Sequence, residues 1–391
     1  VLKDDTEVLS EVVVVGYGIQ KKANLSGAVA QVNSDELTNR PISNVSSGLQ
    51  GLMPGVTITA GQGRPGEDGS NIRIRGVGTL NNASPYILID GVESGSMNDL
   101  DPNDIESISV LKDASSAAIY GSKASNGVIL ITTKKGKEGK LSVQFSSSSE
   151  FSKAYMTPEF QNTYGNKKDM YESWGEKLLT PTSYDPKKDF FNTGTNFINS
   201  VTLTTGTKSN QTFASVSSTN SKGIVPNNEY ERLNFTIRNT ATFLNDKLQL
   251  DLGASYVKQK DKNMVSQGQY WNPVISAYLF PRGESFDDIK TFERYDQSRN
   301  IPIQYWPIAD ATYGSQNPYW TAYRNIATNE KSRYMLYLNG SGKKRLNAVI
   351  DAVTEIRDKF DDPMNNDSFY GKVDCLLTEL EALMENYKET K

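Results

Sequence analysis

Most side chains that carry common enzyme chemistry are absent or isolated in this sequence. It contains no histidine, which excludes Ser-His-Asp and Cys-His catalysis, histidine-ligated zinc and histidine-based pH switching. The only cysteine, Cys375, cannot form an internal disulfide. Two carboxylates are enough for glycoside hydrolysis, but no pair lies in a recognisable setting. We therefore expect no catalytic residues, and a glycan-hydrolysing enzyme is a disfavoured alternative.

Two stretches resemble ligand-binding loops without meeting their requirements. Asp99, Asp101 and Asn103 have the spacing of the first calcium ligands of an EF-hand. However, Asp104 stands where that motif requires glycine, and Val110 stands where it requires glutamate. The glycine-rich segment 61–69 is neither a P-loop nor a GxGxxG motif, so we expect a flexible loop there. The sequence thus predicts neither a metal site nor a cofactor.

The composition limits the class of protein and its partners. The 391 residues carry 42 basic and 46 acidic side chains, a net charge of −4, which is too balanced to indicate nucleic acid as the main partner. No apolar run approaches the roughly 18–20 residues that a membrane-spanning helix needs. A transmembrane β-barrel remains open, because its alternating strands give only a weak hydropathy signal.

The chain divides into three zones of different composition. Residues 1–136 mix short β-branched runs with glycine turns and a few helix starts, which predicts an α+β domain. Residues 137–340 are rich in Ser, Thr, Asn and Tyr in alternating stretches. Residues 346–391 are acidic and have apolar residues at helical spacing, which predicts a short α-helical tail of unknown origin.

The middle zone predicts antiparallel strands with one apolar face and one polar face. Residues 141–151, 199–206, 211–219, 232–243 and 247–259 alternate in this way, with tight turns at 207–210 and 245–246. Strands of about ten residues joined by short turns are typical of a membrane barrel with lipid outside and water inside. A soluble β-sandwich alternates similarly, so the pattern alone leaves both architectures open.

A long segment, 260–330, interrupts these strands and is rich in aromatic residues. Segments of this length without regular structure are usually functional loops or disorder, and the aromatic content argues against disorder. We take Tyr270, Trp271, Trp306 and Trp320 as candidates for contact with a substrate or with another protein that covers these loops. The alternative is ordinary loop packing, or the aromatic girdle that barrels place at the membrane interface.

A series of short motifs resembles the SusC/RagA family of TonB-linked outer-membrane proteins. They occur in the family's order at residues 11–18, 48–56, 72–76, 88–91, 101–108, 110–121, 124–129 and 132–136. Each motif alone is weak, but the ordered series is specific. The resemblance implies a TonB-box region at 1–20, a plug domain at 21–136 and the first part of the barrel at 137–340. About six strands are recognisable, too few to close a barrel, so we expect a truncated one.

The resemblance also implies a function and partners. Members of the family import oligosaccharides or peptides through the outer membrane, with the plug gating the barrel. Their partners are the TonB–ExbB–ExbD complex, a SusD-like lipoprotein, the substrate and outer-membrane lipid. The alternative hypothesis is a soluble periplasmic module derived from the plug, which binds ligands without transport.

Two sets of plug residues follow as candidate sites. The first is a TonB box that would add a strand to TonB, or else simply the first plug strand. It comprises Glu11, Val12, Val13, Val14, Val15, Gly16 and Tyr17. The second is a latch between plug and barrel made by Arg73 and Arg75 with Glu106 and Asp113 as partners. Static ion pairs that hold the plug itself are the favoured alternative, because such pairs often contribute little.

Overall fold

The fold is that of a computed structural model of the chain. The structure describes residues 12–15, 18–21, 29–38, 42, 44–59, 63–66, 70–98, 100–113, 118–168, 170, 172–243, 248–264, 270–308 and 316–342. The predicted helical tail at 346–391 lies outside the described residues, as do Glu11, Gly16 and Tyr17 of the predicted TonB box.

The N-terminal unit, here called the plug (described residues from 12 to 136), is an α+β domain around a mixed sheet. Its five strands lie in the order β3-β8-β9-β6-β7, and only the β6–β9 pair is parallel. They are β3 (Val29–Asn33), β6 (Tyr86–Ile89), β7 (Val92–Glu93), β8 (Ile105–Leu111) and β9 (Val128–Thr133). Two hairpins flank this sheet: β1 (Val12–Val15) with β2 (Gly18–Lys21), and β4 (Val56–Thr59) with β5 (Asn71–Ile74). The short helices are α1 (Ser34–Thr38), α2 (Val45–Gly48), η2 (Pro102–Asp104) and η3 (Ala118–Ala124).

The core of the plug lies on both faces of its central strands. Ile129 and Ile131 of β9 pack into one apolar cluster with Ile108 of β8. Val128 and Leu130, which point the other way, pack into a second cluster. A strand covered on both faces reads as a continuous apolar run, which explains the run from 128 to 131.

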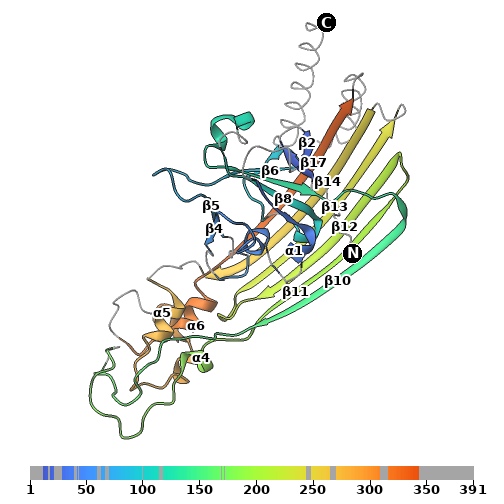
Figure 1. Ribbon diagram of the computed structural model, residues 1–391. Helices are drawn as coiled ribbons and strands as arrows, with labels where there is room; N and C mark the ends of the chain where they lie inside the picture. The colour runs from blue at the N-terminus through green and yellow to red at the C-terminus, as the bar shows by residue number, and fades with distance from the viewer. Residues whose placement is uncertain are drawn as a thin grey trace, which may run out of the picture.

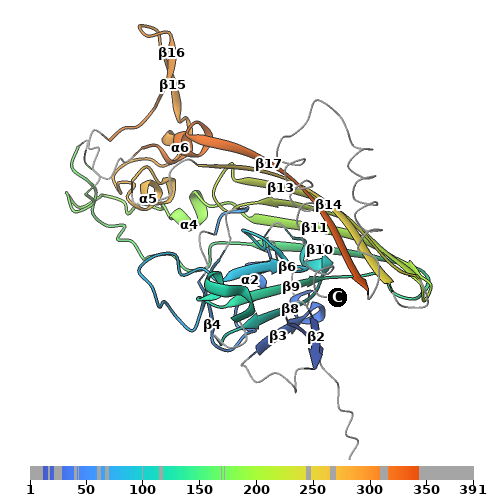
Figure 2. The ribbon, with the colours of Figure 1, turned by 90° about the horizontal axis from the view of Figure 1, so that it is seen from above.

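The second unit is a six-stranded antiparallel sheet, here called the wall sheet. Its strands follow one another in chain order: β10 (Gly139–Ser152), β11 (Gly194–Gly206), β12 (Asn210–Lys222), β13 (Glu229–Phe243), β14 (Leu248–Met264) and β17 (Ile326–Gly342). The sheet is not closed among the described residues, with β10 and β17 at its two edges. Figures 1 and 2 show it curving along one side of the plug.

The two faces of the wall sheet differ sharply in polarity. Strand pairing aligns one apolar row across all six strands: Phe145, Val201, Val216, Phe235, Tyr256 and Tyr334. All of these except Tyr256 are exposed large hydrophobic residues. The adjacent inward row reads Ser146, Ser200, Ser217, Asn234, Val257 and Arg333. An apolar outer face and a polar inner face against a plug are the pattern of a membrane barrel wall, whereas a sandwich would bury the apolar face.

The described helices are all short, and none is long and apolar enough to cross a lipid bilayer.

A charge on the outer face of the wall sheet is expected to impair membrane insertion. Phe235 lies near the middle of β13 and is 43% exposed, so Phe235→Arg would place a cation in the hydrocarbon layer. We expect a loss of about 2–4 kcal/mol in the free energy of folding in lipid vesicles, measured by urea titration. Phe235→Leu, the matched control, should insert like the wild type. Equal stability of the Arg and Leu variants would contradict a lipid-facing role.

The long loops form a packed lobe at one end of the wall sheet (Figures 1 and 2). This loop lobe consists of the described residues of 153–193 and 270–325. It contains α4 (Pro186–Asp189), α5 (Pro273–Tyr278), η4 (Asp288–Lys290), β15 (Glu293–Asp296), β16 (Ile301–Gln304) and α6 (Pro318–Tyr323). The three α-helices each begin with an Asp or Asn cap followed by proline, a strong start signal. The segment 260–330 therefore has more regular structure than its sequence predicts.

Candidate functional site at the interface of plug and wall

A two-residue turn positions the plug carboxylate that reaches the wall sheet. Asp90 and Gly91 connect β6 to β7 with backbone φ angles of +49° and +87°. This left-handed pair is typical of a type I′ turn, for which Asp-Gly is a favoured sequence. The Asp90 carboxylate accepts hydrogen bonds from the backbone N of Thr133 at 3.0 Å and from its Oγ1 at 2.6 Å. The turn thus fixes Asp90 beside the end of β9.

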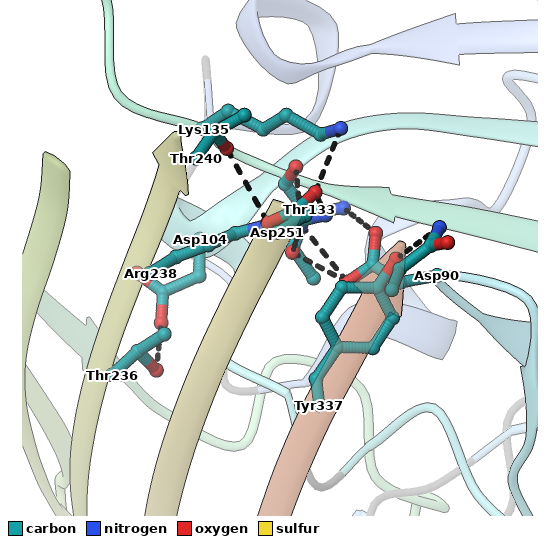
Figure 3. Close-up of polar contacts among 10 residues, drawn as sticks. Asp90, Asp104, Thr133, Lys135, Thr236, Arg238, Thr240, Asp251 and Tyr337 are labelled. Atoms are coloured by element: carbon teal, nitrogen blue, oxygen red, sulfur yellow. Dashed lines mark hydrogen bonds and ion pairs between the residues drawn. The ribbon is translucent and has the colours of Figure 1, made fainter. Parts of the chain in front are cut away.

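Arg238 of β13 connects this turn to the wall sheet, as Figure 3 shows. Its Nη1 lies 3.1 Å from Oδ2 of Asp90 and also donates to Oγ1 and the carbonyl oxygen of Thr133. Its Nε and Nη2 donate to the two carboxylate oxygens of Asp251 on β14, at 2.8 and 2.7 Å. The Arg238 side chain is only 4% exposed. One buried guanidinium therefore joins a plug carboxylate to a wall carboxylate.

Further groups balance and shield this cluster. Lys135 Nζ lies 2.9 Å from Oδ2 of Asp251, so two cations face two carboxylates. The hydroxyl of Thr240 also donates to Asp251, at 3.3 Å. The Tyr337 ring lies 4.9 Å from the Arg238 guanidinium, which is within cation–π range. A buried charge is tolerated only when it is paired and hydrogen-bonded, and here both conditions hold.

The chain passes close to the wall sheet where the plug ends. At Gly136, a side-chain Cβ would collide with the backbone of Gln211 and Thr212 on β12. Glycine allows this approach, which brings the end of the plug against the strand next to β13.

A second polar contact involves the helical turn η2. Asp101 caps η2 by accepting a hydrogen bond from the backbone N of Asn103 at 2.7 Å, and its other oxygen accepts one from the hydroxyl of Ser217 on β12. Asp104 accepts a hydrogen bond from Thr236 on β13 at 2.8 Å. Burial and the charge of neighbouring Asp101 raise the pKa of Asp104 to about 7, although hydrogen bonds from Ser215 and Thr236 oppose the shift. The wall therefore holds two plug carboxylates through hydroxyl groups.

Two wall arginines extend the contact along the plug. Arg232 donates to the backbone O of Asn98 at 3.4 Å, and Arg333 donates to the hydroxyl of Ser94 at 3.2 Å. Together with the two clusters, these contacts make the interface largely polar. A polar interface separates at a lower cost than an apolar core, because water can replace its hydrogen bonds.

The predicted latch residues lie elsewhere. Arg75 forms an ion pair with Asp113 at 2.5 Å, and both residues belong to the plug. Arg73 donates to the backbone O of Ile72 and to the hydroxyl of Ser84, also within the plug, while Glu106 is exposed. The Arg75–Asp113 pair therefore lies within the plug, as in the alternative of static ion pairs. The ionic contact between plug and wall is instead made by Arg238 of β13 with Asp90.

The aromatic candidates divide between packing and exposure. Trp306 packs against the loop-lobe core, with its ring 6.0 Å from that of Phe280. Trp320 is half-buried in α6. Tyr270 and Trp271 are 55% and 47% exposed. Of the four, the last two therefore have the most surface available for a ligand or a lid protein.

The described part of the predicted TonB box forms a strand. Val12–Val15 is β1, which pairs with β2 in an antiparallel hairpin, with Val12 opposite Lys21 and Val15 opposite Gly18. One edge of β1 is therefore already paired within the chain. Its use by TonB remains a prediction.

Comparisons with known proteins identify the architecture. The family profile described as "TonB-dependent Receptor Plug Domain" matches residues 21–128. The chain is 34% identical over 339 residues to the TonB-dependent receptor SusC of Bacteroides thetaiotaomicron. The aligned region covers 82% of this chain and 32% of SusC. The chain belongs to the SusC/RagA family of TonB-dependent receptors. Proteins of this family are outer-membrane proteins, which places the chain in the outer membrane.

A further relative and a solved structure are also similar to this chain. The TonB-dependent receptor P39 of Formosa agariphila is 47% identical over 153 residues, covering 38% of this chain and 14% of its own length. The structure of the RagAB peptide transporter matches with a TM-score of 0.62 and 23% identity, over 81% of this chain and 39% of that one. The present chain thus spans about a third of SusC and less of P39.

The sequence predictions do not include Arg238 and Asp251, the wall residues of this cluster, although the sequence contains a signal for them. Residues 232, 234, 236 and 238 are all polar and alternate with Leu233, Phe235 and Ile237 along β13. An arginine on the inward face of a barrel that contains a plug must be neutralised there. That reasoning selects Arg232 and Arg238, and Asp251 follows from the same alternation on β14.

Proposed function

We propose that this chain supplies the plug and the first wall strands of a TonB-dependent importer of oligosaccharides or peptides. The observation that supports this best is the polar interface, in which Arg238 joins Asp90 of the plug to Asp251 of the wall. Such a contact holds the plug at rest and can be exchanged for water when the plug is pulled. The proposal includes no catalytic step.

The proposed partners come from the relatives. One is named a TonB-dependent receptor and another belongs to a peptide transporter, RagAB. For this chain we propose energy from the TonB–ExbB–ExbD complex, a SusD-like lipoprotein over the loop lobe, and an oligosaccharide or peptide as substrate. The outer face of the wall sheet would contact outer-membrane lipid.

In the proposed mechanism, TonB pulls on residues 11–17, and the contacts between plug and wall resist this pull until they break. The β-branched residues Val12–Val15 are suited to pair with an edge strand of TonB by backbone hydrogen bonds. Pulling on this segment would then apply force to the plug, including the turn that carries Asp90. Substrate capture at the loop lobe would precede this step.

A proline in the proposed TonB box tests the mechanism. Val14→Pro removes a backbone donor and fixes φ, so it should block strand addition. We expect uptake of labelled peptides and oligosaccharides by host cells to fall to the level of a strain without TonB. The control Val14→Thr keeps the donor and the β propensity, so it should transport normally. Normal transport by V14P would contradict the proposal.

Fractionation separates this function from the alternative of a soluble periplasmic module. A chain extracted from the outer membrane that migrates as a compact band, and shifts on boiling, would support the importer. The exposed apolar rows of the wall sheet favour that result. Recovery only in the soluble fraction would contradict it.

A further inference from the structure

A cavity in the loop lobe combines aromatic walls with charges of both signs. Its volume is about 590 Å³, within the range of small-molecule sites, and it lies between residues 159–174 and 278–282. Phe160, Trp174 and Tyr278 supply aromatic surface. Lys167 and Arg282 supply positive charge, while Glu159 and Glu172 supply negative charge.

Arg282 is held in this cavity in an unusual way. Its guanidinium lies 4.6 Å from the ring centroid of Phe160 and 5.0 Å from that of Tyr184. Contacts with two rings fix the guanidinium plane and leave the N–H groups at its edge as the available donors. The backbone N of Arg282 donates to the hydroxyl of Ser173 at 3.1 Å, which anchors the residue at its base. Arg282 is therefore preorganised before any ligand binds.

The charge of Arg282 is buried and has no direct ion-pair partner among the described residues. The residue is only 3% exposed, and its Nη1 has no hydrogen-bond acceptor among the residues that the structure describes. No ion pair of Arg282 is present within the part of the chain that the structure describes. The nearby Asp185 favours the charged form of Arg282 electrostatically, but its carboxylate caps α4 through the backbone N of Lys187 at 3.0 Å and pairs with Lys188 at 3.7 Å. Buried charges are normally paired, so this guanidinium has an unfilled requirement for an anion.

We propose that this cavity binds the carboxylate of a short peptide, with Arg282 as its anchor. A guanidinium held in a fixed plane suits a planar carboxylate, which it binds through two parallel N–H···O contacts. The aromatic residues would receive an apolar side chain, and Glu159 and Glu172 lie where the cavity can accept the amino group. A peptide carries all three features, whereas an acidic oligosaccharide lacks the cation and the apolar side chain. The peptide class rests on the proposed import function, but the carboxylate site does not.

Matched ligands test the site on the full chain purified in detergent. The probes are the tripeptide Ala-Leu-Phe and its C-terminal amide, with binding followed by calorimetry. We expect the acid to bind about 10–100-fold more tightly than the amide, the usual effect of a charged hydrogen-bonded contact. Equal binding of the two, or binding of neither, would overturn the proposal. Stronger binding by digalacturonate than by the tripeptide would overturn the peptide assignment.

Substitutions at Arg282 test whether this side chain causes the preference for the acid over the amide. Arg282→Met should abolish the preference for the acid, and Arg282→Lys should lose most of it, because lysine keeps the charge without the planar pair of donors. The compact band that shifts on boiling checks that each variant is folded. Retained preference in a folded R282M would overturn the assignment. Normal binding by the wild type with no TonB-dependent uptake would instead contradict the proposed import function and leave the site intact.

Discussion

Replacing Arg238 by methionine is expected to weaken the docking of the plug on the wall by about 3–5 kcal/mol, the usual result of removing one partner from a buried ion pair. The substitution leaves the Asp90 and Asp251 carboxylates facing each other, with Lys135 as the one cation paired with them among the described residues. It also removes the donors to Thr133. Hydrogen exchange at the backbone amide of residue 133, together with the unfolding midpoint in urea, measures the loss.

Two comparisons show whether the effect belongs to the buried cluster. Arg299→Met removes an arginine that is 71% exposed and paired with Asp296 at 3.6 Å, so it should change stability by less than about 1 kcal/mol. The triple variant R238M/D90N/D251N removes the three buried charges together and leaves only Lys135 of the cluster charged, which at 44% exposure can be solvated by water, so it should recover much of the stability lost in R238M. If R238M and R299M are equally stable, the cluster does not hold the plug. If the triple variant is less stable than R238M, unpaired charge is not the cause.

The strands of the wall sheet could be predicted well from the sequence, because the residues on the outer face are apolar and those facing the plug are mostly polar. Residues such as Leu233, Phe235 and Ile237 point outward, and the polar residues between them point inward. A two-residue period carries this information locally, within a single strand. The short turn after β11 is equally local. Elements of this kind need no knowledge of distant segments.

The candidate site was harder to predict because its partners are distant in the sequence. Asp90 and Arg238 are brought together only by the plug docking and by the register of β13. Sequence reasoning instead paired arginines and carboxylates within the plug, where Arg75 and Asp113 do meet. The motifs that carry the family resemblance contain Asp90, Asp101, Asp104, Thr133 and Lys135, so they marked the interface without revealing its wall partners.

The contact between Asp104 and the wall is expected to weaken as the pH rises. The pKa of Asp104 is raised to about 7 in the folded chain, because the carboxyl is buried and Asp101 lies nearby, whereas an unfolded aspartate titrates near 3.9. Between these values the folded chain binds more protons than the unfolded chain, so stability falls with increasing pH. From pH 5 to pH 8 we expect a loss of about 2–3 kcal/mol, with most of it below pH 7.

The substitution Asp104→Asn tests whether Asp104 causes this loss of stability with rising pH. Asparagine is neutral throughout, so D104N should lose the pH-dependent step and be more stable than the wild type at pH 8 if its amide keeps the bond to Thr236. The control Glu106→Gln alters an exposed carboxylate two residues away and should retain the wild-type step. A step of unchanged size in D104N would assign the titration to another group. Its loss would mean that a proton on Asp104 helps to hold the plug against the wall, so the contact is strongest in mild acid.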